Sequence, residues 1–230
     1  MTASETYVVC EGYHDRAFWA GALSYLGCSD PGQTRTGHRI IFNDPWGTPV
    51  RGGQYAYETP NGHFVRVVPV GGRGNILPLA KKRLQDRVQR ELHRLVIGID
   101  TDVEAGEDLT DDAGMVATNL LAWVRTIEAK ATAQADGSVV LSEGGTRVDL
   151  VRWRIADGES RADLPDKQTL ERVVCEALRR AYPQRSAPVR AWLASRPEPP
   201  AADPKEHALS HVAGWYAKLG SYEGAIRAWW

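Results

Sequence analysis

The chain has 230 residues, 28 of them basic and 29 acidic, and its formal net charge of -1 is not that of a general nucleic-acid coat protein. A hydrophobic fraction of 43% excludes a chain that is disordered throughout. Apolar runs fall short of the ~18 residues that span a bilayer, the first residues lack a secretion signal, and the 3 cysteines do not suit a disulfide framework. We therefore expect a cytoplasmic protein without membrane contact.

The first half of the chain alternates strand and helix patterns. Residues 7–10 are an apolar run typical of a strand, and residues 15–26 carry apolar side chains at the spacing of a helix. Residues 29–62 are punctuated by Gly, Pro, Thr and Asn, which predicts an inserted β-ribbon or a long loop. A second strand is expected at 64–70, followed by a glycine-rich turn and a basic amphipathic helix at 77–92.

The second half continues the alternation. Residues 95–99 are apolar on both faces, which favours the centre of a parallel sheet that helices cover on each side. A helix is expected at 112–131, a hairpin insertion near 133–148, a fourth strand at 150–156 and a helix at 169–182.

This order of elements predicts an α/β fold with a doubly wound parallel sheet, flanked by helices and interrupted by β-hairpin insertions near 29–62 and 133–148. We expect residues 1–196 to form this domain. Residues 197–230 are expected to form a linker and a C-terminal helical extension that packs on the domain.

Acidic residues follow two of the expected strands. The first strand is followed by Glu11-Gly-Tyr-His-Asp15, and the central strand by Asp100-Thr-Asp102-Val-Glu104. In sheets of this type ligands bind where strands end, and crowded carboxylates repel one another unless a cation neutralises them. Hard oxygen ligands suit Mg²⁺ or Mn²⁺, so the sequence predicts a metal site. The alternative is that Asp15 caps the first helix while Asp102 and Glu104 solubilise a loop.

The two acidic motifs resemble those of the toprim domain, which occurs in topoisomerases, bacterial primases and OLD-family nucleases. The likeness is nearest to the toprim domains of OLD-family nucleases and to small stand-alone toprim proteins. Val70-Gly-Gly-Arg-Gly-Asn75, Leu170-Glu171 and Lys205 agree with this resemblance, which leaves out the two insertions. The chain contains no Walker motif, so it does not include the ATPase half of a complete OLD protein.

The resemblance implies a role for each matching residue. Glu11, Asp100 and Asp102 match catalytic acids, and Lys205 matches a late residue that contacts phosphate. The implied ligands of two Mg²⁺ or Mn²⁺ ions are Glu11, Asp15, Asp100, Asp102, Glu104 and Glu171. Two such ions, about 4 Å apart, can hold both the attacking and the leaving oxygen of a phosphodiester.

A glycine-rich turn and the basic helix after it are candidates for binding backbone phosphates. The turn is expected to expose backbone N–H groups near a helix start, which suits an anion. Its arginine stands where the family often has lysine, and a guanidinium keeps the positive charge. The helix either grips nucleic acid or is no more than a solvated face. The residues concerned are Gly71, Gly72, Arg73, Lys81, Lys82 and Arg83.

We therefore expect a Mg²⁺- or Mn²⁺-dependent phosphodiesterase, most simply a toprim-type nuclease acting on DNA or RNA. The alternative is a non-catalytic toprim subunit that binds nucleic acid or a partner protein. Intact acidic motifs favour catalysis, because a pure binding module has no reason to keep like charges crowded. Expected partners are nucleic acid and an ATPase or another protein. His207 and His211, four residues apart on an expected helix, are a weaker candidate for metal binding.

Overall fold

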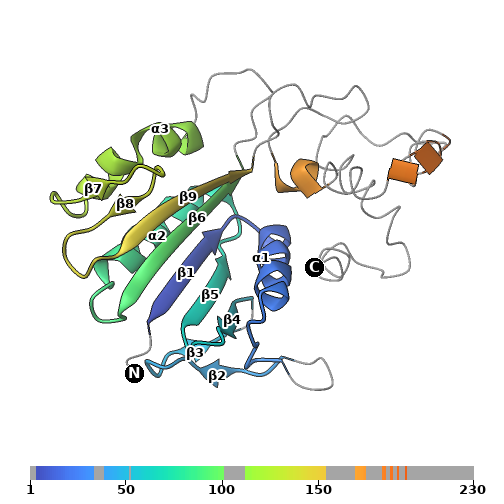
Figure 1. The fold of residues 1–230 in the computed structure, drawn as a ribbon, viewed down its shortest axis with the longest axis horizontal. Helices are drawn as coiled ribbons and strands as arrows, with labels where there is room; N and C mark the ends of the chain where they lie inside the picture. The colour runs from blue at the N-terminus through green and yellow to red at the C-terminus, as the bar shows by residue number, and fades with distance from the viewer. Residues whose placement is uncertain are drawn as a thin grey trace.

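Figure 1 shows the computed structural model of the protein. It describes residues 4–33, 39–51, 53–100, 112–153 and 169–174, with the backbone alone at 112–118, and six single positions at 183, 184, 187, 188, 191 and 195. The strands are β1 Glu5–Cys10, β2 Phe42–Asn43, β3 Pro49–Val50, β4 Tyr55–Glu58, β5 Phe64–Pro69, β6 Leu92–Asp100, β7 Thr132–Ala133, β8 Val139–Val140 and β9 Arg147–Trp153. The helices are α1 Tyr13–Tyr25, α2 Ile76–Gln85 and α3 Asp112–Arg125, and a 3-10 turn, η1, spans Arg73–Asn75.

A seven-stranded, mostly parallel sheet forms the centre of the described structure, in the order β4-β5-β1-β6-β9-β8-β7. Strands β5, β1, β6 and β9 run parallel to one another, whereas β4, β8 and β7 add antiparallel edges. The strand expected at the centre is β6, the middle strand of the seven. The predicted α/β class and its parallel core are therefore confirmed.

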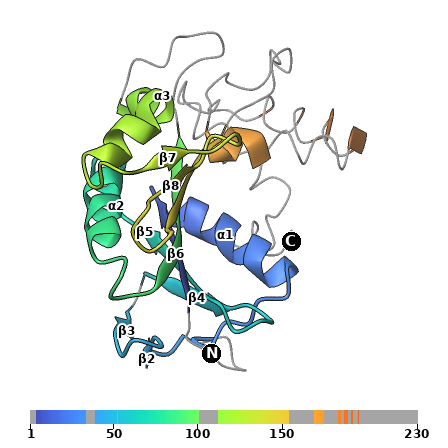
Figure 2. The same cartoon turned by 60° about the vertical axis from the view of Figure 1, so that its left-hand side comes forward.

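Helices cover both faces of this sheet. Figures 1 and 2 show α1 on one face, and α2 and α3 on the other. Alternate side chains of β1 point to the two helix layers. Val8 belongs to the apolar cluster that includes Ala20 of α1, and Val9 belongs to the cluster that includes Ala80 of α2 and Val124 of α3. This alternation follows from the two-residue period of a strand, and it gives each helix layer its own apolar cluster.

Several expected boundaries were wrong, and the basic helix shows why. It ends at Gln85, and Leu92 opens β6 instead of closing the helix. Arg87 turns inward, donates to the Leu84 carbonyl at 2.9 Å and forms ion pairs with Glu128 and Glu143. The hydrogen bond gives a partner to a carbonyl in the last turn of the helix, and the ion pairs hold the chain where it leaves the helix.

Three other elements also begin or end differently from the expectation. Helix α1 begins at Tyr13 rather than at residue 15, and α3 ends at Arg125 rather than near residue 131. Strand β9 begins at Arg147, because it is itself an arm of the hairpin with β8. The insertion near 29–62 contains the hairpin β2–β3, and β4 joins the main sheet.

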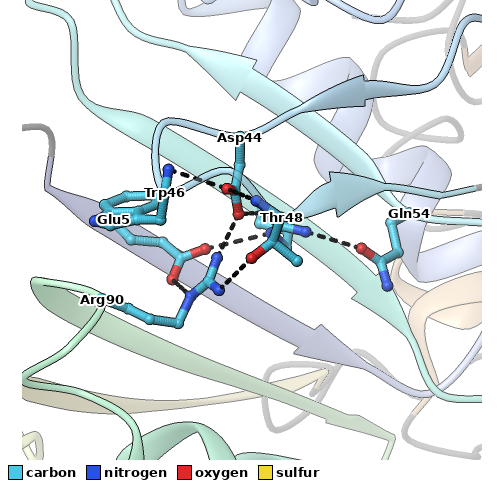
Figure 3. Close-up of polar contacts among 7 residues, drawn as sticks. Glu5, Asp44, Trp46, Thr48, Gln54 and Arg90 are labelled. Carbon is cyan, nitrogen blue, oxygen red and sulfur yellow. Dashed lines mark hydrogen bonds and ion pairs between the residues drawn. The ribbon is translucent and has the colours of Figure 1, made fainter.

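A buried ion network fastens this insertion to the sheet. It comprises Glu5, Asp44, Arg66 and Arg90, and Figure 3 shows three of them with their polar neighbours. Glu5 accepts from the Nε of Arg66 at 3.3 Å and from the Nε of Arg90 at 3.2 Å, and Asp44 pairs with both guanidinium groups. Two carboxylates and two guanidinium groups therefore balance at the amino end of β1.

Residues 169–174 lie beside the carboxyl ends of β6 and β9, with Leu170–Val174 in a helical turn. The expected extension at 197–230, including Lys205, His207 and His211, lies outside the described residues. Within the described part of the chain, no helix is both long and apolar enough to cross a membrane.

A candidate acidic metal site at the ends of the central strands

The carboxyl ends of two neighbouring parallel strands bring the acidic motifs together. Strand β1 ends at Cys10, directly before Glu11, and its neighbour β6 ends at Asp100. A pocket of about 270 Å³ opens at this edge. It is lined by Glu11, Gly12, Tyr13, His14, Asp15, Gly71, Gly72, Asp100 and Glu171. We call its four carboxylates, from Glu11, Asp15, Asp100 and Glu171, the acidic cluster.

Asp15 is buried and held through both carboxylate oxygens. One oxygen accepts from the Gly12 backbone N–H at 3.1 Å, and the other accepts from the Trp153 indole N–H at 3.0 Å. Gly12 is the N-cap of α1, so Asp15 stabilises the helix start from the third helical position rather than as the N-cap itself. Asp15 therefore has a structural role in addition to its place in the pocket.

Asp100 is the last residue of β6 and is buried beside the other acids. One of its oxygens accepts from the Leu170 backbone N–H at 2.9 Å. Burial raises the pKa of Asp100 to about 8, and repulsion from Asp15, Glu171 and Glu11 adds to the rise. Burial also raises the pKa of Asp15, against the hydrogen bonds from Trp153 and Gly12, which lower it.

Glu171 reaches the pocket from the helical turn that follows β9 in the chain. It is 2% exposed, and its Oε1 lies 2.9 Å from the Nδ1 of His14. The sequence interpretation left out His14 and Tyr13, although both lie between the acids of the Glu11–Asp15 motif. Their position inside that motif could have indicated that they belong to the pocket.

The structure brings together only part of the predicted site. Glu11, Asp15, Asp100 and Glu171 share one pocket, as the motifs indicated. Asp102, Glu104 and Lys205 lie outside the described residues. Among the residues that are described, no three His, Cys, Asp or Glu side chains already lie close enough together to hold a metal ion. The donor set nevertheless consists of carboxylate oxygens, which are the ligands that Mg²⁺ and Mn²⁺ take.

The glycine-rich turn does not form the anion seat that the sequence predicted at its first two residues. The N–H groups of Gly71 and Gly72 both donate to the Glu11 carbonyl, at 3.0 and 3.1 Å. They are turned toward the backbone after β1, and so they position the start of α1 rather than an anion. Arg73 opens η1 and, in the described structure, is not a lining residue of the pocket.

The basic surface on α2 is smaller than the sequence predicted. Lys81 and Lys82 are exposed. Arg83 is half-buried, and its guanidinium lies 4.1 Å from the centre of the Tyr7 ring, a cation–π contact that anchors the helix to β1. Arg87 and Arg90 lie beyond the helix and are held in ion pairs.

Comparisons of the chain with protein-family models, with curated proteins and with solved structures found no match. The chemistry of the site is therefore inferred from its own residues.

Proposed function

We propose that the protein is a divalent-metal-dependent phosphodiesterase of toprim type, acting as a nuclease on DNA or RNA. The observation that carries this proposal is the acidic cluster, in which four carboxylates line one pocket at the ends of β1 and β6. The pKa of Asp100 is raised by its burial and by repulsion from three further carboxylates. A site with this excess of negative charge favours a bound cation.

The residues of the acidic cluster would have different roles. Asp100, Glu11 and Glu171 would hold Mg²⁺ or Mn²⁺, with Asp102 and Glu104 as further ligands from the adjoining segment. Asp15 is fixed by Gly12 and Trp153, so its carboxyl group would stay at one place in the pocket. When bound, such cations supply positive charge to the phosphate oxygens and acidify a water molecule.

The test is incubation of the purified protein with labelled DNA and RNA panels in Mn²⁺ and in EDTA. We expect cleavage in Mn²⁺ alone. Asp100→Asn should lower the rate about 100-fold or more, since removing a ligand costs more than the 10–100-fold seen for outer partners. Asp136→Asn is the matched control, because it makes the same change at an exposed carboxylate that pairs with Arg147 and is not part of the pocket.

Two results would count against the proposal. Undiminished cleavage in EDTA, or equal cleavage by Asp100→Asn, would exclude the acidic cluster as the catalytic site. Binding of nucleic acid without any cleavage in Mn²⁺ would favour the non-catalytic toprim subunit instead.

A further inference from the structure

Tyr13 is an aromatic side chain placed on the rim of the acidic pocket. It is the first residue of α1, and it lines the pocket together with Glu11 and Asp100. Tyr13 is 60% exposed. An exposed ring beside a polar pocket offers a flat surface to whatever enters that pocket.

The ring of Tyr13 packs against the guanidinium group of Arg16. The guanidinium of Arg16 lies 4.7 Å from its centre, and the same guanidinium lies 4.1 Å from the centre of the Tyr55 ring. Arg16 is itself buried and donates to the Gly53 carbonyl at 3.0 Å. Because Arg16 lies against one face of the ring, a ligand that enters the pocket would meet the ring from the other face.

The insertion contributes to this support. Gly53 lies in the segment between β3 and β4, and a Cβ atom there would be 4.0 Å from the Tyr13 hydroxyl. Its φ of +89° is a conformation that side chains rarely adopt, and this favours glycine at position 53. The insertion is in turn fastened to the sheet through Asp44 of the buried ion network. The ring is therefore held on a rigid base, and little entropy is lost when a ligand stacks on it.

We propose that Tyr13 is a stacking platform for an unpaired nucleobase of the strand whose phosphodiester enters the acidic pocket. The inference rests on the proposed function and narrows its substrate to nucleic acid with an unpaired base at the site. Every base has a π-face, so stacking tolerates any sequence. Within a duplex both faces of a base are covered by its neighbours, so only a single strand or an opened end presents a face to the ring.

The test uses a single-stranded oligonucleotide of abasic spacers that carries one 2-aminopurine base, and a second strand made of spacers alone. Binding is measured in Ca²⁺ for the full chain and for Tyr13→Phe, Tyr13→Leu and Tyr25→Leu. Tyr25 is the matched control, since it lies at the other end of α1 and is 70% exposed.

We expect the wild type to bind the base-bearing strand roughly 5- to 150-fold more tightly than the spacer strand, the range found for base–aromatic stacking. Tyr13→Phe and Tyr25→Leu should keep this preference, and 2-aminopurine fluorescence should be quenched on binding. Tyr13→Leu should lose both the preference and the quenching, because leucine keeps apolar bulk without a ring.

A preference that survives in Tyr13→Leu, or equal binding of the two strands by the wild type, overturns the stacking platform. Cleavage of natural strands in Mn²⁺ separates the two proposals. Cleavage without a Tyr13-dependent preference would overturn the platform alone, and the preference without cleavage would overturn the proposed function alone.

Discussion

The two ends of the central strands bury carboxylates in opposite ways. At the amino end of β1, Glu5 has no exposed surface, and Glu5 and Asp44 share the guanidinium groups of Arg66 and Arg90 (Figure 3). At the carboxyl end, the acidic cluster places four carboxylates in one pocket, and the charged groups that act on Asp100 are all acidic. The ion network joins each carboxylate to guanidinium groups, whereas in the acidic cluster burial and neighbouring carboxylates raise the pKa of Asp100.

The ion network pairs its buried acids with arginine, whereas the acidic cluster places four carboxylates in one pocket, where Glu171 lies against His14. A buried carboxylate without a partner is costly, so it takes up a proton or attracts a cation. Arginines at the amino end make the ion network a structural device. The raised pKa of Asp100, to about 8, makes it a carboxyl group whose charged form a bound cation would stabilise.

The largest effect is expected when the same carboxylate-to-amide change is made at both ends. Glu5→Gln leaves two buried guanidinium groups facing one carboxylate, and its NH₂ group would face an arginine N–H. We expect the free energy of unfolding to fall by about 3–5 kcal/mol. Asp100→Asn keeps an oxygen for the Leu170 N–H and removes repulsion, so its free energy of unfolding in EDTA should stay equal or rise.

Chemical denaturation of both variants and the wild type at pH 8 in EDTA measures this contrast. If Asp100→Asn loses as much stability as Glu5→Gln, then Asp100 serves as a structural ion partner and the two ends are alike. If Glu5→Gln loses nothing, the buried ion network does not hold the insertion.

The next effect is a pH dependence of opposite sign with and without metal. Because the folded pKa of Asp100, about 8, lies above its ordinary value of 3.8, folding takes up a proton between these pH values. The stability from this group is fully present below pH 3.8, and it is lost as the pH rises through about 8. A cation needs the deprotonated carboxylate, so the affinity for Mn²⁺ should rise about tenfold per pH unit below pH 8 for each proton released.

Mn²⁺ titrations followed by thermal melts at pH 6, 7 and 8 check this linkage. The wild type should show a growing upward shift of the melting temperature with pH at fixed Mn²⁺. Asp100→Asn should show a flatter dependence, because the titrating group is gone. A shift that is equal in both proteins at every pH would place the metal outside the acidic cluster.

Local spacing in the sequence was enough to place the three strands β1, β5 and β6 and the acidic motifs. The apolar run before Asp100 indicated a central parallel strand, and its neighbour before Glu11 followed from the alternation of elements. What spacing could not predict is contact between distant residues. Arg87 pairs with Glu128 and Glu143, which are 41 and 56 positions away, and these pairs turn an apparent continuation of the basic helix into its end.

The same limit applies within the site. The hydrogen bond from Trp153 to Asp15 joins residues 138 positions apart, so the sequence could offer Asp15 only as a helix cap or as a ligand. The expectation that Gly71 and Gly72 expose their N–H groups was wrong for a related reason. A glycine turn predicts exposed N–H groups, but whether they meet an anion or a carbonyl depends on which strand end lies opposite, and here it is that of β1.

The smallest effect concerns the remaining basic surface on α2, where two of the three expected basic residues are exposed. Lys81 and Lys82 are exposed, whereas Arg83 is held over the Tyr7 ring at 4.1 Å.

If the two lysines bind backbone phosphates, Lys81→Ala with Lys82→Ala should reduce the slope of log affinity against log salt by up to about one unit per lost contact. Lys130→Ala removes an exposed lysine beyond α3 and should leave the slope unchanged. Arg83→Ala should lower stability by about 0.5–1 kcal/mol through loss of the cation–π contact, and it should change the slope less than the double lysine variant, since the half-buried guanidinium is held over the Tyr7 ring. Salt titrations of binding to a single-stranded oligonucleotide separate the three variants. An unchanged slope in the double lysine variant would mean that α2 presents a solvated face and that the acidic pocket, through its cations, accounts for phosphate binding without it.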